Sequence, residues 1–284
     1  MVLFALATGS AGPRVAYLHG LFGQGRNWMQ IAKAVSGPNG DQTQALLLDL
    51  PNHGRSSWTK DFSFDAYAAQ VIDTLETATR GERWTLVGHS LGGKTAMIAA
   101  LQRPDLIERL VVVDIAPRDY GNLDRFSGYV EEMQRLPLDQ ISTRAEAEEL
   151  FDEPDPGVKA FLLQNLRRDK DSWRWQTNLD LVARDIAGEA RMGGWPVQPG
   201  DYEPYPNPVL WLVGGESRYV REEDAETMRA LFPRTLQVTV KGAGHWVHTE
   251  RPEVVVEALR RFILGPERAA GGASDEAADG ASGT

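Results

Sequence analysis

Short apolar runs alternate with longer segments of helical spacing along most of this chain, and this alternation limits the folds open to it. The runs are rich in Val and Leu and show little polar alternation, which is typical of strands buried on both faces of a parallel sheet. Helical patterns, such as residues 64–79 and 94–102, separate them. We therefore predict an open, mainly parallel α/β sheet with helices on both faces, whose strands are residues 15–18, 45–50, 84–87, 110–113, 209–213 and 236–240.

The alternation of strand-like runs and helical segments is interrupted between residues 118 and 206. This stretch is charged and helical in pattern, and its last part is rich in Gly and Pro. Because this stretch separates two sheet strands, we predict a helical cap over the crevice at the strand ends. The expected organisation is an α/β core of residues 1–117 and 207–264 and a cap of residues 118–206. Residues 265–284 are small and charged without apolar periodicity, so we expect a disordered tail.

Charge and composition exclude several classes of function. The net charge of −10 and a pI near 5.1 argue against nucleic acid and anionic membrane surfaces as partners. The chain has no cysteine, so disulfides, thiolate metal sites and a cysteine nucleophile are excluded. The apolar start lacks a basic segment, and no stretch is long enough to span a bilayer. We expect a cytoplasmic monomer or homodimer.

The pentapeptide Gly88-His89-Ser90-Leu91-Gly92 lies between an apolar run and a helical run of small residues. In this strand–turn–helix setting, a G-x-S-x-G motif forms a nucleophile elbow whose serine stands exposed on a strained turn. The flanking glycines let the strand and helix backbones approach closely. Ser90 is therefore the candidate nucleophile.

The other strands also end in motifs, and in an open α/β sheet the carboxyl ends of the strands border the ligand crevice. A serine is a weak nucleophile near neutral pH and needs a base, which histidine supplies best. Of the histidines, His245 lies in a Gly-flanked loop after the last strand, where it can reach the elbow. The motifs are residues 19–23 (HGLFG), 49–56 (DLPNHGRS), 114–117 (DIAP) and 242–246 (GAGHW).

Together with the elbow, these motifs resemble the α/β-hydrolase family over residues 14–264. The resemblance implies that His245 is the general base. It places one oxyanion-hole amide on Leu91, directly after the nucleophile, and the other in the loop that follows His19. In that loop we predict the amide of Leu21, with that of Phe22 as the alternative.

The triad acid departs from the common family pattern. Most members carry an Asp after the strand at residues 209–213, but here Ser217 occupies that position. The remaining candidates are Asp114, after the strand next to the elbow strand, and Glu216. Several segments resemble the small YbfF-like esterases of bacteria and their mitochondrial relatives: residues 88–97, the DIAP segment, residues 161–166 and residues 173–175. That subgroup implies Asp114 as the acid and Ser217 as its hydrogen-bonding auxiliary.

Aromatic residues near the motifs suggest an apolar substrate cleft. We predict that Phe22, Trp28, Trp175 and Trp246 contact substrate. Lys94 and Arg118 are candidates for attracting an anionic acyl or coenzyme A group, although solvated lysines on helices are commoner.

We predict a serine carboxylic ester hydrolase, acting on short-to-medium acyl esters or thioesters through an acyl-enzyme, with no metal or organic cofactor. Two alternatives stay open. One is another chemistry on the same triad, namely C–C hydrolysis, perhydrolysis or a lyase step in quinone biosynthesis. The other is a non-catalytic ligand receptor on the same fold.

Overall fold

A seven-stranded sheet forms the centre of the computed structural model, which describes residues 2–79, 81–121, 123–170, 172–187, 192–198 and 200–265. The strand order is β1-β3-β2-β4-β5-β8-β9. Strand β1 runs antiparallel to β3, and the other pairings of this sheet are parallel, which confirms the predicted fold class. The strands are β1 Ala5–Thr8, β2 Arg14–Leu18, β3 Gln44–Leu48, β4 Trp84–His89, β5 Ile107–Val113, β8 Val209–Gly214 and β9 Thr235–Val240.

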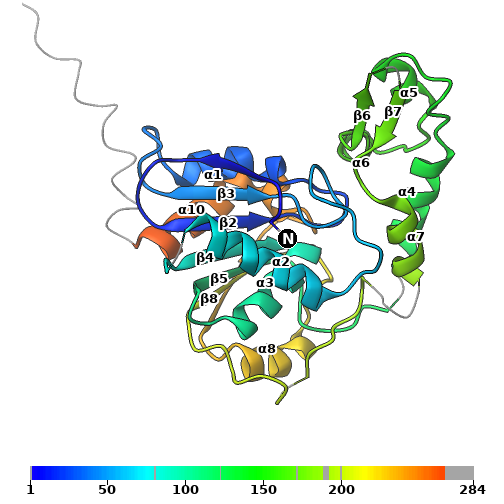
Figure 1. Cartoon of the computed structure of the whole chain (residues 1–284). Coiled ribbons are helices and arrows are strands. Elements are labelled where there is room, and N and C mark those ends of the chain that lie inside the picture. Colours follow the sequence, from blue (N-terminus) through cyan, green and yellow to red (C-terminus); the bar gives the residue numbers. More distant parts are fainter. Residues whose placement is uncertain are drawn as a thin grey trace, which may run out of the picture.

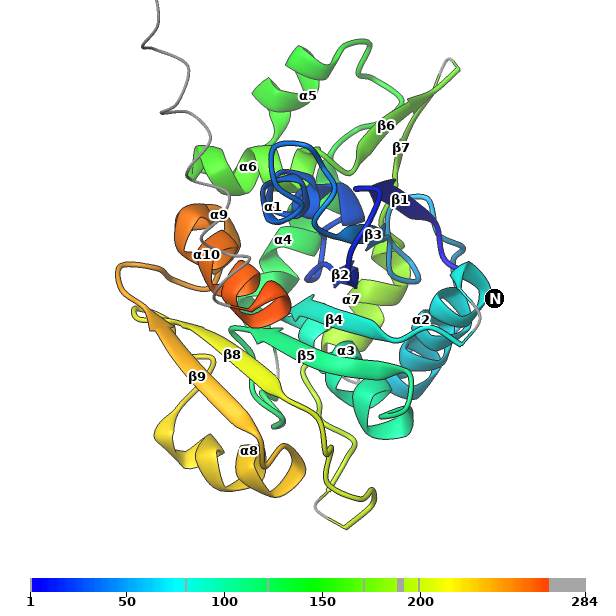
Figure 2. The ribbon, with the colours of Figure 1, turned by 90° about the vertical axis from the view of Figure 1, so that its left-hand side faces the viewer.

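Helices cover both faces of the sheet (Figures 1 and 2). Helices α1 and α10 pack on one face, where strand residues such as Val15, Val111 and Leu210 are buried. The opposite face is covered by α2, α3 and α8. These helices and short turns are η1 Gly25–Trp28, α1 Met29–Val35, α2 Phe64–Ala78, α3 Leu91–Gln102, η2 Glu222–Asp224, α8 Ala225–Leu231, α9 Val247–Glu250 and α10 Pro252–Leu264.

The segment between β5 and β8 carries the predicted cap, and Figure 1 shows its elements grouped on one side of the core. Its helices are α4 Asp124–Arg135, α5 Arg144–Leu150, α6 Pro156–Leu163 and α7 Leu179–Ala187. The cap is mainly helical, and it also contains an antiparallel hairpin that was not predicted, formed by β6 Leu166–Asp169 and β7 Ser172–Trp175. Helix α6 ends at Leu163. Beyond its end, the buried Asn165 side chain donates to the carbonyls of Leu162 and Phe22.

Strand β1 was not predicted, and it forms the edge of the sheet next to β3. Within the described part of the chain, no helix is long and apolar enough to cross a membrane. The predicted tail, apart from Gly265, lies outside the described residues.

Candidate active site

Ser90 occupies the sharp turn between β4 and α3. Its backbone has φ 52° and ψ −117°, the left-handed region that non-glycine residues rarely adopt. A Cβ at Gly92 would lie 2.5 Å from the carbonyl oxygen of His19, and one at Gly88 would lie 2.3 Å from that of Gly92. The two glycines are therefore required by close backbone approach, and the turn has the geometry of a nucleophile elbow.

Asp114 directly follows β5 and is also left-handed, with φ 50°. Its carboxylate is fully buried and is held by hydrogen bonds on both oxygens. Oδ1 accepts the Gly214 amide at 2.9 Å, while Oδ2 accepts the Ser217 hydroxyl at 2.5 Å and the Nδ1–H of His245 at 2.8 Å. A buried carboxylate that accepts several hydrogen bonds is held in a fixed position.

His245 lies in the loop between β9 and α9. Because its Nδ1–H donates to Asp114, the other nitrogen, Nε2, is the one that can accept a proton. Glu216, the alternative acid, has an exposed side chain, and its backbone amide donates to the carbonyl of Ala243. The geometry therefore favours Asp114 over Glu216 as the partner of His245.

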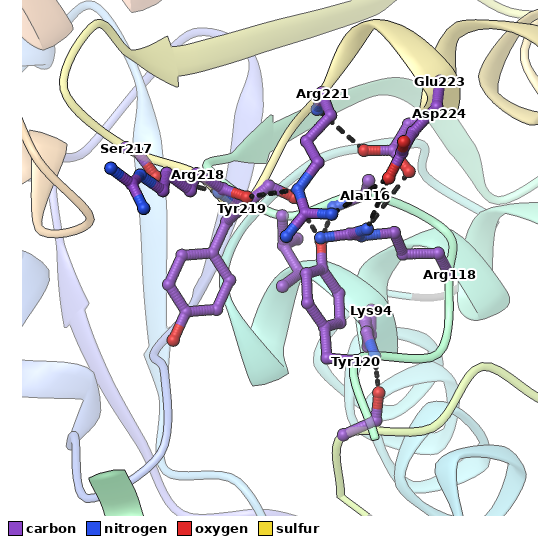
Figure 3. Close-up of polar contacts among 12 residues, drawn as sticks. Lys94, Ala116, Arg118, Tyr120, Ser217, Arg218, Tyr219, Arg221, Glu223 and Asp224 are labelled. Atoms are coloured by element: carbon purple, nitrogen blue, oxygen red, sulfur yellow. Dashed lines mark hydrogen bonds and ion pairs between the residues drawn. The ribbon is translucent and has the colours of Figure 1, made fainter. Parts of the chain in front are cut away.

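Two tyrosines that sequence reasoning missed, Tyr120 and Tyr219, lie beside the acid and the base. Figure 3 shows both tyrosines next to the loops that carry Ala116 and Ser217. The ring of Tyr219 stacks on the imidazole of His245, with centroids 3.8 Å apart and planes inclined by 18°. The Tyr219 amide donates to Ser217 Oγ, and its carbonyl accepts the hydroxyl of Tyr120. That hydroxyl in turn accepts the Ala116 amide at 2.8 Å. The loop after β5 is thus tied to the loop that carries Ser217.

The other histidines are buried around the site. Burial lowers the pKa of His19 to about 4, and it lowers those of His53 and His248 to about 3. Burial also holds the pKa of His89 well below its ordinary value, and its Nε2–H donates to the carbonyl of His245. These four rings are therefore neutral near pH 7, which fits scaffold roles better than acid–base roles.

The oxyanion-hole prediction rests on two backbone amides. Leu91 is the first residue of α3, so its amide lies at the positive end of the helix. The amide of Phe22 already donates to His53 Nε2 at 3.3 Å. Leu21 lines the space beside Ser90, and within the described residues its amide meets no protein acceptor. This arrangement favours Leu21 over Phe22.

Three hollows lie at the site, and the first shares lining residues with each of the other two. The first, the His245 cavity, holds about 250 Å³ and contains the predicted contact residue Trp246; it is lined by His19, Gly20, Leu21, Gly23, Asn27, His89, Ser90, Phe126, Phe161, Gln164, His245, Trp246, His248 and Thr249. The second, the Leu91 cavity, holds about 30 Å³ and is lined by Leu21, Ser90, Leu91, Lys94, Ile115, Tyr120, Leu123, Phe126, Met192, Gly193 and Tyr219. The third, the α6 groove, holds about 330 Å³ and is lined by Asp155, Gly157, Val158, Phe161, Trp246, Thr249 and Glu250.

Trp28 does not line any of these hollows, which corrects the expectation that it contacts substrate. Its side chain is fully buried, and its indole N–H donates to the carbonyl of Leu18 at 3.1 Å. One side of the ring stacks on His248 at 4.4 Å, and Tyr17 packs against it at 5.4 Å. Trp28 thus supports the wall of the His245 cavity from behind.

Phe22 and Trp175 are likewise absent from the cavity walls. Phe22 is fully buried in the core, with its ring 6.2 Å from that of Phe126. Trp175 is buried inside the cap against Phe151. Both side chains contribute packing rather than direct substrate contact, because apolar residues near a motif also have a core to fill.

The two basic residues proposed for anion binding have other partners (Figure 3). Lys94 is buried, and its ammonium donates to the carbonyls of Gly193 and Gly194 at 2.5 and 2.7 Å. Burial lowers the pKa of Lys94 to about 7. Arg118 pairs with Glu223 on the surface next to η2. Neither arrangement provides a free cation for coenzyme A.

Comparison with known proteins gives the family. A family model described as "Alpha/beta hydrolase family" matches residues 15–258. The chain belongs to the α/β-hydrolase family. The mouse protein "sn-1-specific diacylglycerol lipase ABHD11" is 36% identical over 257 residues, covering 88% of this chain and 81% of the relative. "Esterase YbfF" of Escherichia coli is 30% identical over 251 residues, covering 88% and 92%.

A solved structure points in the same direction. The "Marine microorganism esterase" superposes with a TM-score of 0.84 at 30% sequence identity, covering 92% of this α/β hydrolase and 99% of that chain. The predicted resemblance to YbfF-like esterases is therefore confirmed. Among the described residues, no group of three or more His, Asp or Glu side chains comes together as a metal site.

Proposed function

We propose that this α/β hydrolase cleaves carboxylic esters through a covalent acyl-enzyme on Ser90, with His245 as general base, Asp114 as the acid of the triad and Ser217 as its auxiliary. The observation that carries the proposal is the contact between the imidazole of His245 and the buried carboxylate of Asp114, at the wall of a cavity that Ser90 also lines. The names of the relatives, a lipase and two esterases, support the same class of reaction.

The first half of the reaction forms the acyl-enzyme. His245 Nε2 takes the proton of Ser90 as Oγ attacks the substrate carbonyl, and Asp114 stabilises the imidazolium that results. The amides of Leu21 and Leu91 hold the oxyanion of the tetrahedral intermediate. The imidazolium then gives its proton to the leaving oxygen, and the alcohol departs.

The second half returns the enzyme to its starting state. His245 takes a proton from a water molecule, which attacks the acyl carbonyl, and Ser90 leaves with that proton as the acid is released. Ser217 donates to the same oxygen of Asp114 that holds His245. It therefore shares the negative charge and keeps the carboxylate aimed at the imidazole. The stacked ring of Tyr219 restricts rotation of the imidazole.

Hydrolysis of p-nitrophenyl acetate and butyrate by the wild type and by Ser90→Ala tests the proposal. We expect turnover by the wild type and a loss of kcat of at least about 10⁴-fold in the variant, because the nucleophile cannot be replaced. The thermal melt of Ser90→Ala serves as the control and should stay close to that of the wild type. A fluorophosphonate probe should label the wild type at Ser90 alone. Equal turnover by both proteins, or no turnover of any ester, would refute the assignment.

A further inference from the structure

Ser90 lies between two hollows of very different size. Ser90, Leu21 and Phe126 line both the His245 cavity and the Leu91 cavity, so the two meet at the nucleophile. His245 lines only the first of them, and Leu91, whose amide is one of the two proposed oxyanion donors, lines only the second. An ester bound at Ser90 must place one of its two ends in each hollow.

The proton transfer by His245 decides which hollow takes the alcohol end of the ester and which takes the acyl end. His245 must hand its proton to the leaving oxygen, so that oxygen and the alcohol attached to it belong on the side that the imidazole lines. The carbonyl oxygen faces the amides of Leu21 and Leu91. The acyl chain is left with the Leu91 cavity, which His245 does not line.

The acyl side is small. Its volume of about 30 Å³ is room for only two or three heavy atoms, since one water needs roughly 10–15 Å³ of such space. Lys94 and Gly193 lie in its wall, and the ammonium of Lys94 donates to the carbonyls of Gly193 and Gly194. The ammonium also lies 4.6 Å from the centre of the Tyr120 ring. These contacts join helix α3 to the cap, as Figure 3 shows for Lys94. They limit the length of the cavity.

The leaving-group side is long and largely apolar. The His245 cavity shares Phe161, Trp246 and Thr249 with the α6 groove, which adds about 330 Å³ along the cap helix α6. Both ionisable side chains in the wall of that groove, Asp155 and Glu250, are acidic. Such a wall accepts an uncharged apolar group and repels phosphates.

We propose that the preferred substrates are esters of a short acyl group, acetyl to butyryl, with a bulky, uncharged and mainly apolar alcohol. The substrate class follows from the unequal hollows on the two sides of Ser90, and it rests on the ester hydrolase function proposed above. Long-chain acyl esters are excluded because the Leu91 cavity is too small for the acyl chain. Coenzyme A thioesters are excluded because the acidic wall of the α6 groove repels their phosphates.

Two series of neutral esters, followed by pH-stat, test this inference. Along butyl acetate, butyrate, hexanoate and decanoate, we expect kcat/KM to fall at least tenfold beyond butyrate. Along methyl, butyl, benzyl and octyl acetate, we expect it to rise at least tenfold. Butyryl-coenzyme A should be a poorer substrate than octyl butyrate.

Three variants assign the two sides. Met192→Ala enlarges the Leu91 cavity and should move the acyl optimum up by two or more carbons, with the alcohol series unchanged; Leu123→Ala is the second choice if Met192→Ala does not fold. Phe161→Ala removes a wall shared by the His245 cavity and the α6 groove, so it should raise KM for octyl acetate but not for methyl acetate. Leu150→Ala, at an exposed position of α5 in the same cap, is the matched control and should change neither series.

The outcomes separate this inference from the function on which it rests. If the wild type hydrolyses esters but prefers longer acyl chains and small alcohols, the assignment of the two sides is overturned and the ester hydrolase function stands. The same holds if Met192→Ala changes the alcohol series instead of the acyl series. No hydrolysis of any ester would overturn both.

Discussion

Asp114 has a strained, left-handed backbone, and both oxygens of its carboxylate accept hydrogen bonds. A left-handed conformation costs a non-glycine residue of order 1–3 kcal/mol, but Asp and Asn tolerate it better than other residues. Here the strain is offset by the hydrogen bonds that its carboxylate makes to Gly214, Ser217 and His245. Asparagine at this position keeps the backbone and the shape, so it isolates the effect of the charge.

Asp114→Asn should lower kcat for p-nitrophenyl butyrate by about 10²- to 10⁴-fold, because the amide cannot both hold the His245 tautomer and stabilise the imidazolium. Glu216→Gln is the matched control, since it makes the same chemical change on an exposed side chain in the neighbouring loop. We expect its kcat to stay within about threefold of the wild type. Steady-state kinetics on the two purified variants measure both, and a larger loss in Glu216→Gln would reverse the assignment of the acid.

The structure brings the predicted polar residues together, whereas it places most of the predicted aromatic residues away from the cavity walls. Ser90, Asp114, Ser217 and His245 each follow a strand, and the carboxyl ends of the strands border one crevice, so topology alone brings them near one another. No such rule exists for Trp28, which is close to a motif in sequence and packs behind His248. Whether an aromatic ring faces a cavity or the core depends on tertiary packing, which periodicity does not reveal.

The first turn of helix α3 packs so closely against the end of β2 that no side chain would fit at Gly92. The backbone of Gly92 approaches the carbonyls of Leu18 and His19 at the end of β2, so an added Cβ would lie 2.7 and 2.5 Å from their oxygens. Backbone atoms at strand ends cannot move aside as a flexible side chain can. This approach is what places the first turn of α3, and with it the Leu91 amide, next to the loop after β2.

Gly92→Ala should lower the free energy of unfolding by at least about 2 kcal/mol, because overpacking against backbone forces the helix away from the sheet. Gly128→Ala is the matched control, as nothing lies within 4 Å of a Cβ built at Gly128 in helix α4. That change should stabilise the protein by roughly 0.5–1 kcal/mol through helix propensity. Urea unfolding of both variants gives the comparison, and equal free energies for Gly92→Ala and the wild type would contradict the close-packing argument.

Elements with strong apolar signals were predictable, and those with weak signals were not. The central strands are mostly apolar, as is typical of parallel strands buried on both faces. The hairpin strands Leu166–Asp169 and Ser172–Trp175 are short and carry exposed charged residues, so their pattern does not differ from that of a polar helix or loop. Strand β1 has four residues and pairs on one side alone, which leaves too short a pattern to recognise.

At the scale of the whole molecule, all five histidines of the chain gather around one site, and four of them are held neutral by burial. In the unfolded chain, each of these four histidines would have a pKa near 6.5. Folding therefore lowers their pKa values, and below about pH 6.5 the unfolded chain binds protons that the folded chain does not. The buried Asp49 acts in the opposite direction, since burial raises its pKa.

The free energy of unfolding should therefore fall as the pH drops from about 6.5 toward 4, by up to about 1.4 kcal/mol per pH unit for each of the four histidines. Urea unfolding at pH 7, 6 and 5 measures this slope, and four groups of one sign outweigh the single Asp49. His248→Gln is the informative variant: Nδ1 of His248 is buried without a partner in the described structure, so the change removes one titrating ring at little loss of hydrogen bonding. The slope of its unfolding free energy against pH should be smaller by up to about 1.4 kcal/mol per pH unit, which corresponds to the uptake of one proton fewer. A wild-type stability that does not change between pH 7 and 5 would show that the four rings are not held neutral, and would remove the reason for assigning them scaffold roles.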